Sequence, residues 1–190
     1  MKVYFKTFGC RTNIYDTELL KSYVKNYEIV NDESVADIIV VNSCTVTNGA
    51  DSGVRNYINS MRNSGKKVIL TGCGAVSKGD ELFKSSAIFG VLGASNKSKI
   101  DEMLGKSEPF YELGDLNFID KNIVSNYENH TKAFIKIQEG CDFACSYCII
   151  PSVRGFSRSI DEDIILKEAK ILASNGYSEI VLTGTNIGSY

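Results

Sequence analysis

The sequence predicts an α/β fold in which helices cover both faces of a mostly parallel sheet. Three observations lead to this prediction. The run Ile38–Val41 is wholly apolar, which is typical of a strand buried on both faces. Strand-like and helix-like segments alternate through the first hundred residues. A second strand–helix–strand unit begins at Ala133 and ends near Thr183.

The elements are expected from apolar spacing and from the turn residues between them. The first helix is expected because Leu19, Leu20, Tyr23 and Val24 share one helical face. The expected strands are Val3–Thr7, Tyr27–Val30, Asp37–Asn42, Val68–Thr71, Ile88–Leu92, Ala133–Gln138 and Glu179–Thr183. The expected helices are Asp16–Tyr27, Thr47–Asn63, Ser77–Phe83, Ser95–Leu104 and Asp161–Asn175.

The alternation of elements predicts two domains. Residues 1–105 are expected to form the first domain, and residues 132–190 the beginning of a second. The segment 106–131 is polar, carries Pro109 and is predicted to be a linker with room for a short strand of its own. Two strands cannot close the core of a domain, so the second domain is expected to be truncated after Tyr190.

Composition narrows the function classes. Apolar residues make up 43% and charged residues 23% of the chain, as in ordinary soluble proteins. No apolar run approaches the length of a membrane span, and the N-terminus lacks a signal peptide, so a cytoplasmic protein is expected. A net charge of −2 gives no global argument for nucleic acid. In a reducing compartment, six cysteines indicate metal, cluster or catalytic roles rather than disulfides.

Three cysteines that are distant in sequence each follow a predicted strand. These residues are Cys10, Cys44 and Cys73. The carboxyl ends of parallel strands lie along one edge of a sheet, so the three thiols are expected to converge there. Three thiolates suit an iron–sulfur cluster with one open iron better than a closed zinc site, which needs four ligands. The alternative is that they are ordinary buried thiols.

A second group of cysteines is compact. Cys141, Cys145 and Cys148 lie within eight residues, so one tight loop could wrap them around a cluster and leave the fourth iron free. The alternative is a structural zinc site. It would need a fourth ligand, and His130 is the one histidine of the chain.

The cysteine pattern, with Tyr147 before the last thiol, resembles the signature of the radical S-adenosylmethionine superfamily. The segments TFGCRTN, NSCTVT, TGCGA and AFIKIQEGCDFACSYCIIPSVRG together resemble the methylthiotransferases of that superfamily. Within the family, TFGCRTN and VLTGTNIGSY look most like the branch that modifies N6-threonylcarbamoyladenosine in tRNA.

The resemblance implies a fold and an activity. The fold is an N-terminal parallel-sheet, three-layer methylthiotransferase domain followed by the start of a partial (β/α) radical SAM barrel. The activity is that of a transferase which adds a methylthio group to carbon 2 of N6-threonylcarbamoyladenosine-37 in the tRNA anticodon loop. The sibling branches act on isopentenyladenosine in tRNA or on an aspartate of a ribosomal protein. A binding or electron-transfer module without radical chemistry is the alternative from another class.

The resemblance also implies two 4Fe–4S clusters, S-adenosylmethionine, an external electron donor and a sulfur source. The expected ligands of the radical SAM cluster are Cys141, Cys145 and Cys148. The expected ligands of the second cluster are Cys10, Cys44 and Cys73. The residues expected to contact S-adenosylmethionine are Tyr147, Gly184, Thr185 and Asn186.

Four side chains have two interpretations each. Tyr147 packs near the cofactor adenine or is an ordinary core aromatic. Arg154 and Arg158 bind the cofactor carboxylate or an RNA phosphate, or they are solvated. Asn13 hydrogen-bonds near Cys10 or is a cap of the helix expected to begin at Asp16.

Overall fold

The computed structural model describes residues 1–45, 48–128 and 130–190, without the side chains of residues 48–51. The expected start of a helix at Thr47 lies outside the described residues. The strands are β1 (Lys2–Thr7), β2 (Glu28–Ile29), β3 (Ile38–Ser43), β4 (Lys67–Gly72), β5 (Gly90–Leu92), β6 (Phe110–Glu112), β7 (Ala133–Glu139), β8 (Arg158–Ser159) and β9 (Ile180–Gly184). The α-helices are α1 (Arg11–Tyr23), α2 (Asn48–Asn63), α3 (Cys73–Lys84), α4 (Ile100–Leu104), α5 (Ile150–Arg154) and α6 (Glu162–Ser174). Short 3-10 turns occupy Glu33–Val35, Ala94–Lys99 and Ile187–Ser189.

Six strands form one parallel sheet in the order β2-β1-β3-β4-β5-β6. The fully buried strand β3 lies inside this sheet, where both of its faces are covered. The α/β prediction is therefore confirmed, and the apolar run that led to it is explained by burial from two sides.

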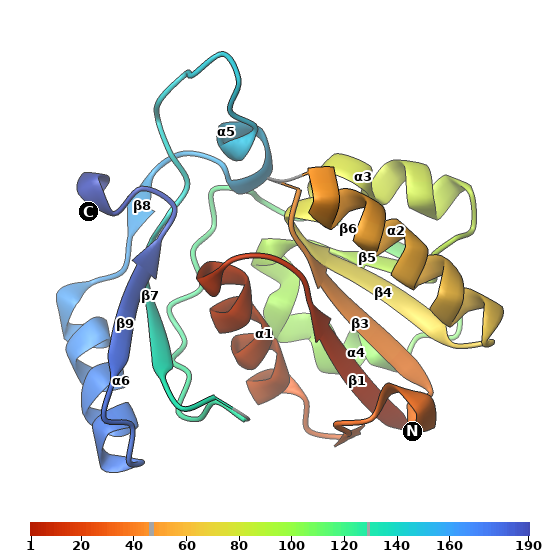
Figure 1. The fold of residues 1–190 in the computed structure, drawn as a ribbon, viewed down its shortest axis with the longest axis horizontal. Coiled ribbons are helices and arrows are strands. Elements are labelled where there is room, and N and C mark those ends of the chain that lie inside the picture. Colours follow the sequence, from red (N-terminus) through yellow and green to blue (C-terminus); the bar gives the residue numbers. More distant parts are fainter. Residues whose placement is uncertain (46–47, 129) are drawn as a thin grey trace.

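Helices cover both faces of the sheet, as the three-layer prediction requires (Figure 1). Side chains alternate between the faces along each strand. Ile39 and Val41 point toward α2 and α3, where they pack with Ile58 and Leu82. The neighbouring residues of β3 point the other way, toward Leu20 of α1 and the apolar residues of α4.

The second sheet has the order β8-β7-β9, in which β7 and β9 are parallel and β8 is antiparallel. Helix α6 packs on it through Leu172. Helix α1 lies between the two sheets (Figure 1). It buries Leu20 against the first sheet and Tyr15 and Leu19 against Ile135 and its neighbours in the second.

Two helices begin earlier than expected. Helix α1 was expected over 16–27 but covers Arg11–Tyr23, because Cys10 caps it directly after the β1 loop. It ends early because the backbone amides of Lys25 and Asn26 donate to Asp101 at 2.8 and 3.0 Å instead of continuing the helix. Helix α3 starts four residues early, at Cys73, because Gly72 adopts a φ of 78° and turns the chain straight from strand to helix.

The segment predicted as a linker contributes a strand to the first sheet. β6 pairs in parallel with β5, with Val91 opposite Tyr111. The expected helix over 95–104 is a 3-10 turn followed by the short helix α4. The predicted domain boundaries stay a prediction. Among the described residues, no helix is long and apolar enough to cross a lipid bilayer.

A buried carboxylate ties the second half of the linker to both α1 and α6. Glu168 accepts a hydrogen bond from the backbone amide of Val124 at 2.9 Å, and Tyr15 Oη lies 3.5 Å from its other oxygen. The same hydroxyl donates to the carbonyl of Asn122 at 3.1 Å. Burial raises the pKa of Glu168 to about 7, because water no longer solvates the charged form.

We expect Glu168→Gln to stabilise the protein in alkaline solution. The folded-state pKa of Glu168 is about 7, above the ordinary value of 4.5. The folded protein therefore holds this proton more tightly than the unfolded chain, and the free energy of unfolding of the wild type falls as pH rises from 4.5 to 7. The variant should gain roughly 3 kcal/mol at pH 8 and nothing below pH 4.5, at about 1.4 kcal/mol for each tenfold change in proton affinity. Urea unfolding at several pH values measures this difference.

Glu108→Gln, in an exposed loop, is the matched control and should show no such pH dependence. An equal free energy of unfolding for wild type and Glu168→Gln from pH 4.5 to 8 would contradict the expectation.

Candidate functional site

The three scattered cysteines lie at the carboxyl ends of three adjacent parallel strands. Cys10 follows β1, Cys44 follows β3 and Cys73 follows β4. The register keeps these strand ends level, since Asn42 pairs with Thr7 on one side and with Thr71 on the other. Cys44 and Cys73 are buried, whereas Cys10 is exposed. The structure therefore brings together the three residues that the sequence predicted to converge.

Glycine permits the close approach of these strand ends. Gly9 has a φ of 120°, and a Cβ added there would lie 2.4 Å from the Cβ of Cys44. A Cβ added at Gly72 would lie 2.2 Å from Asn42 Oδ1. Both distances are far below van der Waals contact, so any larger residue at these positions would push the cysteine loops apart.

The three thiols line one cavity of about 570 Å³. Its wall is completed from the second half of the chain by Arg154 of α5 and by Gly184 and Thr185 at the end of β9, among others. The cavity thus lies where the carboxyl edge of the first sheet meets the end of β9. Such an edge is the usual location of ligand sites in parallel sheets.

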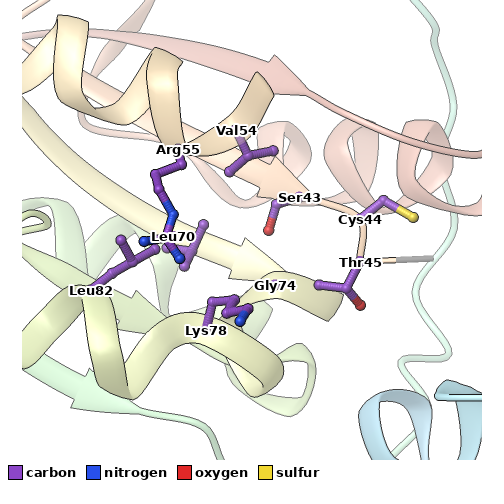
Figure 2. A pocket seen from close by; sticks show the side chains of 9 residues that line it. All are labelled: Ser43, Cys44, Thr45, Val54, Arg55, Leu70, Gly74, Lys78 and Leu82. Carbon is purple, nitrogen blue, oxygen red and sulfur yellow. The ribbon is translucent and has the colours of Figure 1, made fainter. Parts of the chain in front are cut away.

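A second, much smaller space lies behind Cys44, between β3, β4, α2 and α3 (Figure 2). Its volume of about 10 Å³ is at the lower limit for a single water molecule. Figure 2 shows the sulfur of Cys44 pointing away from Arg55 and Leu70 on the far side of this space. The space is a packing gap, and the thiol belongs to the larger cavity.

Arg154 contacts the cavity from α5 and is buried. Its Nε donates to Cys73 Sγ at 3.1 Å, and its Nη1 donates to Glu139 Oε1 at 2.7 Å. Its Nη2 donates to Asn13 Oδ1 at 2.6 Å. One guanidinium therefore binds residues of α1, α3 and β7 at once. These contacts direct Arg154 toward protein groups rather than toward solvent.

A buried ion network surrounds this arginine. Asp16 on α1 receives hydrogen bonds from Lys97 at 2.9 Å and from Lys136 at 2.7 Å. Glu139 receives hydrogen bonds from Lys136 at 3.0 Å and from Arg154 at 2.7 Å. Arg154 Nη1 also lies 3.7 Å from Asp16 Oδ2. Arg158 Nη2 lies 3.6 Å from Glu139 Oε2, so two carboxylates face three buried cations and the partly buried Arg158, and positive charge is in excess beside the thiols.

The network changes the pKa values of its members. Burial alone would raise the pKa of Asp16, but the neighbouring Lys136 and Lys97 outweigh burial and lower it. Burial likewise raises the pKa of the Cys73 thiol, and the adjacent Arg154 opposes part of this increase. The pKa of Arg154 is raised because nearby negative groups outweigh its burial. The pKa of Lys136 is also raised, because Asp16 and Glu139 outweigh its burial, so Lys136 and Arg154 stay charged.

The compact cysteine triplet lies in the loop between β7 and α5, which projects at the top of Figure 1. Cys145 is exposed, and Cys141 and Cys148 are partly exposed. The loop is anchored at its base, where the amide of Cys141 donates to Gly155 O at 3.1 Å. Among residues 1–45, 48–128 and 130–190, no three His, Cys, Asp or Glu side chains meet closely enough to hold a single metal ion.

The residues predicted to contact S-adenosylmethionine lie near the triplet loop. Asn186 Nδ2 is 3.8 Å from Cys141 Sγ, and the backbone amide of Asn186 donates to Gln138 Oε1 at 2.8 Å. Gly184 and Thr185 line the cavity of the other cysteines, so the end of β9 touches both groups. Tyr147 is 90% exposed, which excludes its interpretation as a core aromatic. Contact with the cofactor stays a prediction for all four residues.

The remaining predicted residues have other contacts. Arg158 donates from Nη1 to the carbonyls of Arg154 at 2.8 Å and Phe156 at 2.6 Å, and from Nε to Phe118 O at 3.2 Å. It is not a freely solvated side chain. Asn13 lies inside α1 and does not cap it, and Cys10 Sγ is 3.7 Å from its Oδ1. The interpretation of Asn13 as a neighbour of Cys10 is the one that the contacts favour.

The buried ion network around Arg154 was not predicted from the sequence. Asp16 was expected as the first residue of a helix, and Lys136 only as one residue of the strand Ala133–Gln138. A signal was present in the second case, since Lys136 lies between Ile135 and Ile137 in a strand that is buried along its whole length. An isolated lysine in such a strand needs a buried acidic partner.

Comparison with protein families divides the chain into two matched parts. Residues 2–93 match the family described as "Uncharacterized protein family UPF0004". Residues 135–190 match the radical SAM superfamily. The first match covers the six-stranded sheet up to β5, and the second contains the compact triplet, β9 and α6. The two ranges agree with the order of domains that the sequence motifs predicted.

Curated relatives match the chain over nearly its whole length. A Helicobacter pylori protein named "Putative methylthiotransferase" is 51% identical over 191 residues, which cover 100% of this chain and 46% of the relative. "Threonylcarbamoyladenosine tRNA methylthiotransferase MtaB" of Aquifex aeolicus is 39% identical, covering 100% and 49%. "tRNA-2-methylthio-N(6)-dimethylallyladenosine synthase" of Fervidobacterium nodosum is 32% identical, covering 100% and 45%. The chain spans about half the length of these relatives.

We expect Gly9→Ala to destabilise the protein by about 2–4 kcal/mol, because it adds a strained φ and an overlap with Cys44. Gly53→Ala is the control, since no atom lies within 4 Å of the Cβ it would add. That change should raise the free energy of unfolding by up to about 1 kcal/mol. Urea unfolding measures both, and equal effects of the two substitutions would refute the close approach.

We expect Asp16→Asn to lower the free energy of unfolding at pH 7 by about 3–5 kcal/mol, because it leaves buried cations without their partner. Asp80→Asn removes a comparable Lys contact from an exposed pair and should have no measurable effect. The folded-state pKa of Asp16 is lowered, so the difference should shrink as pH falls below 3.8. An unchanged free energy of unfolding in the Asp16→Asn protein would show that the network contributes nothing to stability.

Proposed function

Because the chain joins a UPF0004 domain to the first part of a radical SAM domain and is similar along its length to methylthiotransferases, we propose that the whole protein adds methylthio groups to tRNA. The observation that carries this proposal is the single cavity that three distant thiols share with the end of β9. A radical SAM enzyme needs one cysteine triplet to hold the cluster that cleaves S-adenosylmethionine. A second triplet would hold the cluster that carries the sulfur to be inserted. A tRNA substrate would also place the protein in the cytoplasm.

The N-terminal residues fit a polynuclear cluster. Cys10, Cys44 and Cys73 surround a space of about 570 Å³, and the glycine at position 9 keeps that space free of a further side chain. The thiols do not meet at one point among the described residues. Three thiolates suit a cluster with one open iron, in which each thiolate binds a different iron, better than a zinc centre, which needs four ligands.

The triplet loop fits the other cluster. Its three thiols lie in one loop between a buried strand and α5, and no fourth cysteine follows Cys148 in the sequence given. Three protein ligands would leave one iron for the amino and carboxylate groups of S-adenosylmethionine. When bound, the two clusters would supply the electron for cleaving S-adenosylmethionine and a carrier for the transferred sulfur. The whole enzyme would draw on an external electron donor and a sulfur source.

The residues of this chain have three tasks in such an enzyme. The loops after β1, β3 and β4 would hold one cluster, and the loop after β7 would hold the other. Gly184 and Thr185 would line the space between them without a bulky side chain, so that the cofactor can approach. Ile150 would contribute an apolar wall that excludes water from reactive intermediates.

The proposed substrate is N6-threonylcarbamoyladenosine-37 of tRNA. The relatives that support it carry that nucleoside in their names and are 39% and 35% identical to the chain. Relatives named for dimethylallyladenosine are 32% to 36% identical, so a modified adenosine of that kind is the competing substrate. An aspartate of a ribosomal protein is a further alternative. An electron-transfer module, without cleavage of S-adenosylmethionine, is the alternative from another class.

We expect the full-length protein, reconstituted anaerobically with iron and sulfide, to form 5′-deoxyadenosine when dithionite and S-adenosylmethionine are added. With tRNA from cells that lack the modification, it should produce 2-methylthio-N6-threonylcarbamoyladenosine, detected by mass spectrometry of digested nucleosides. Product on dimethylallyladenosine would correct the substrate. Two bound clusters without 5′-deoxyadenosine would favour the electron-transfer module.

Two cysteine variants separate the proposed roles. Cys145→Ala should abolish 5′-deoxyadenosine, because the radical cannot form. Cys44→Ala should retain 5′-deoxyadenosine but lose the methylthio product. The exposed Arg55→Met is a control and should retain both activities. Retention of the methylthio product by Cys44→Ala would contradict the role assigned to the N-terminal cysteines.

A further inference from the structure

We propose that Arg154 is a positioning residue of the second half of the chain that holds the N-terminal thiols and sets the reduction potential of the cluster bound by them. The inference rests on the proposed function, since it concerns the same three cysteines. It assigns to Arg154 a role different from binding an RNA phosphate or the carboxylate of S-adenosylmethionine.

The geometry of the guanidinium supports this role. Each of its three nitrogens donates to a different partner, namely Cys73 Sγ, Glu139 Oε1 and Asn13 Oδ1. An arginine that only neutralised Glu139 would need one or two of these bonds. The bond from Nε, at 3.1 Å, is instead directed at a sulfur atom. The side chain is buried, so this orientation is held by the protein and not by solvent.

Arg154 contacts one of the three cysteine loops directly and the other two through Asn13. Cys73 is bound directly. Asn13 Oδ1, which accepts from Arg154, is also 3.7 Å from Cys10 Sγ. The side chain of Asn42, two residues before Cys44, donates to Asn13 O at 2.9 Å. One side chain of the radical SAM part therefore contacts one N-terminal thiol and, through Asn13, the residues that carry the other two loops.

The charge of the surroundings gives this contact an electrostatic consequence. Asp16 and Glu139 are outnumbered by Lys97, Lys136 and Arg154, and Arg154 is the member whose nitrogen contacts a thiol sulfur. A buried positive charge and an N–H···S bond both stabilise negative charge on sulfur. A reduced cluster carries more negative charge than an oxidised one. Arg154 therefore raises the reduction potential and strengthens retention of the cluster.

The test uses full-length protein in which Cys141, Cys145 and Cys148 are all changed to Ala, so that iron binds only at the N-terminal cysteines. Arg154→Met in this background should move the midpoint potential, followed by electron paramagnetic resonance during a dithionite titration, to a more negative value. Release of iron to a chelator should become roughly 10- to 100-fold faster, which is typical of losing a hydrogen bond to a metal ligand. Neither readout depends on catalysis.

Arg154→Lys is the second variant and covers the case in which the methionine protein does not fold. It keeps one positive charge but cannot donate to three partners in fixed directions. Its potential should fall by less than that of Arg154→Met, whereas iron release should again be accelerated. A purely structural role would not order the two potentials in this way.

The outcomes separate the inference from the proposed function. Arg55→Met removes an exposed arginine that is paired with Glu81 and lies across the packing gap from the sulfur of Cys44, and this variant should match the parent in both measurements (Figure 2). Parent-like potential and iron release in both Arg154 variants, or an equal shift in Arg55→Met, would overturn the inference alone. A parent that binds no iron at Cys10, Cys44 and Cys73 would overturn the proposed two-cluster function and the inference together.

Discussion

The arrangement of the two sheets depends on Asp16, a buried carboxylate on the helix that lies between them. It accepts hydrogen bonds from Lys97 of the first part of the chain and from Lys136 of the second. An unpaired charge in this interior would be strongly unfavourable, so the two parts must approach with all partners aligned. Apolar packing of Leu20 on one side and Leu19 on the other holds α1 in the same orientation. The position of the cavity follows from this alignment.

Parallel strand order and one polar interface together create the candidate site. Parallel strand order brings three loops to one edge of the first sheet. The polar interface around Asp16 adds the end of β9 and the guanidinium of Arg154 to the same edge. Neither part of the chain alone would enclose the space. A site assembled in this way is suited to chemistry that needs two separate centres near one another, because Gly184 and Thr185 line the cavity of the N-terminal thiols and the next residue, Asn186, lies 3.8 Å from Cys141 Sγ.

Much of the fold was predictable, because burial of a parallel sheet leaves a strong apolar pattern such as that of β3. The convergence of Cys10, Cys44 and Cys73 was predictable for the same reason, since the ends of parallel strands must meet. The two-sided burial of α1 was not predictable from periodicity. Beside Tyr15 and Leu19, its interface with the second sheet buries polar residues such as Asp16, and a buried polar position has the same sequence pattern as a solvated one.

The short chain segment between Cys148 and Arg154 has a mechanical consequence. Cys148 and Arg154 are separated by only six positions, of which the last five form the single turn α5. Even fully extended, such a segment spans no more than about 20 Å, and a helical turn is much shorter. The covalent length of this segment therefore limits how far Cys148 can lie from Arg154. As long as Arg154 keeps its hydrogen bond to Cys73 Sγ, Cys148 therefore stays within a short distance of that thiol.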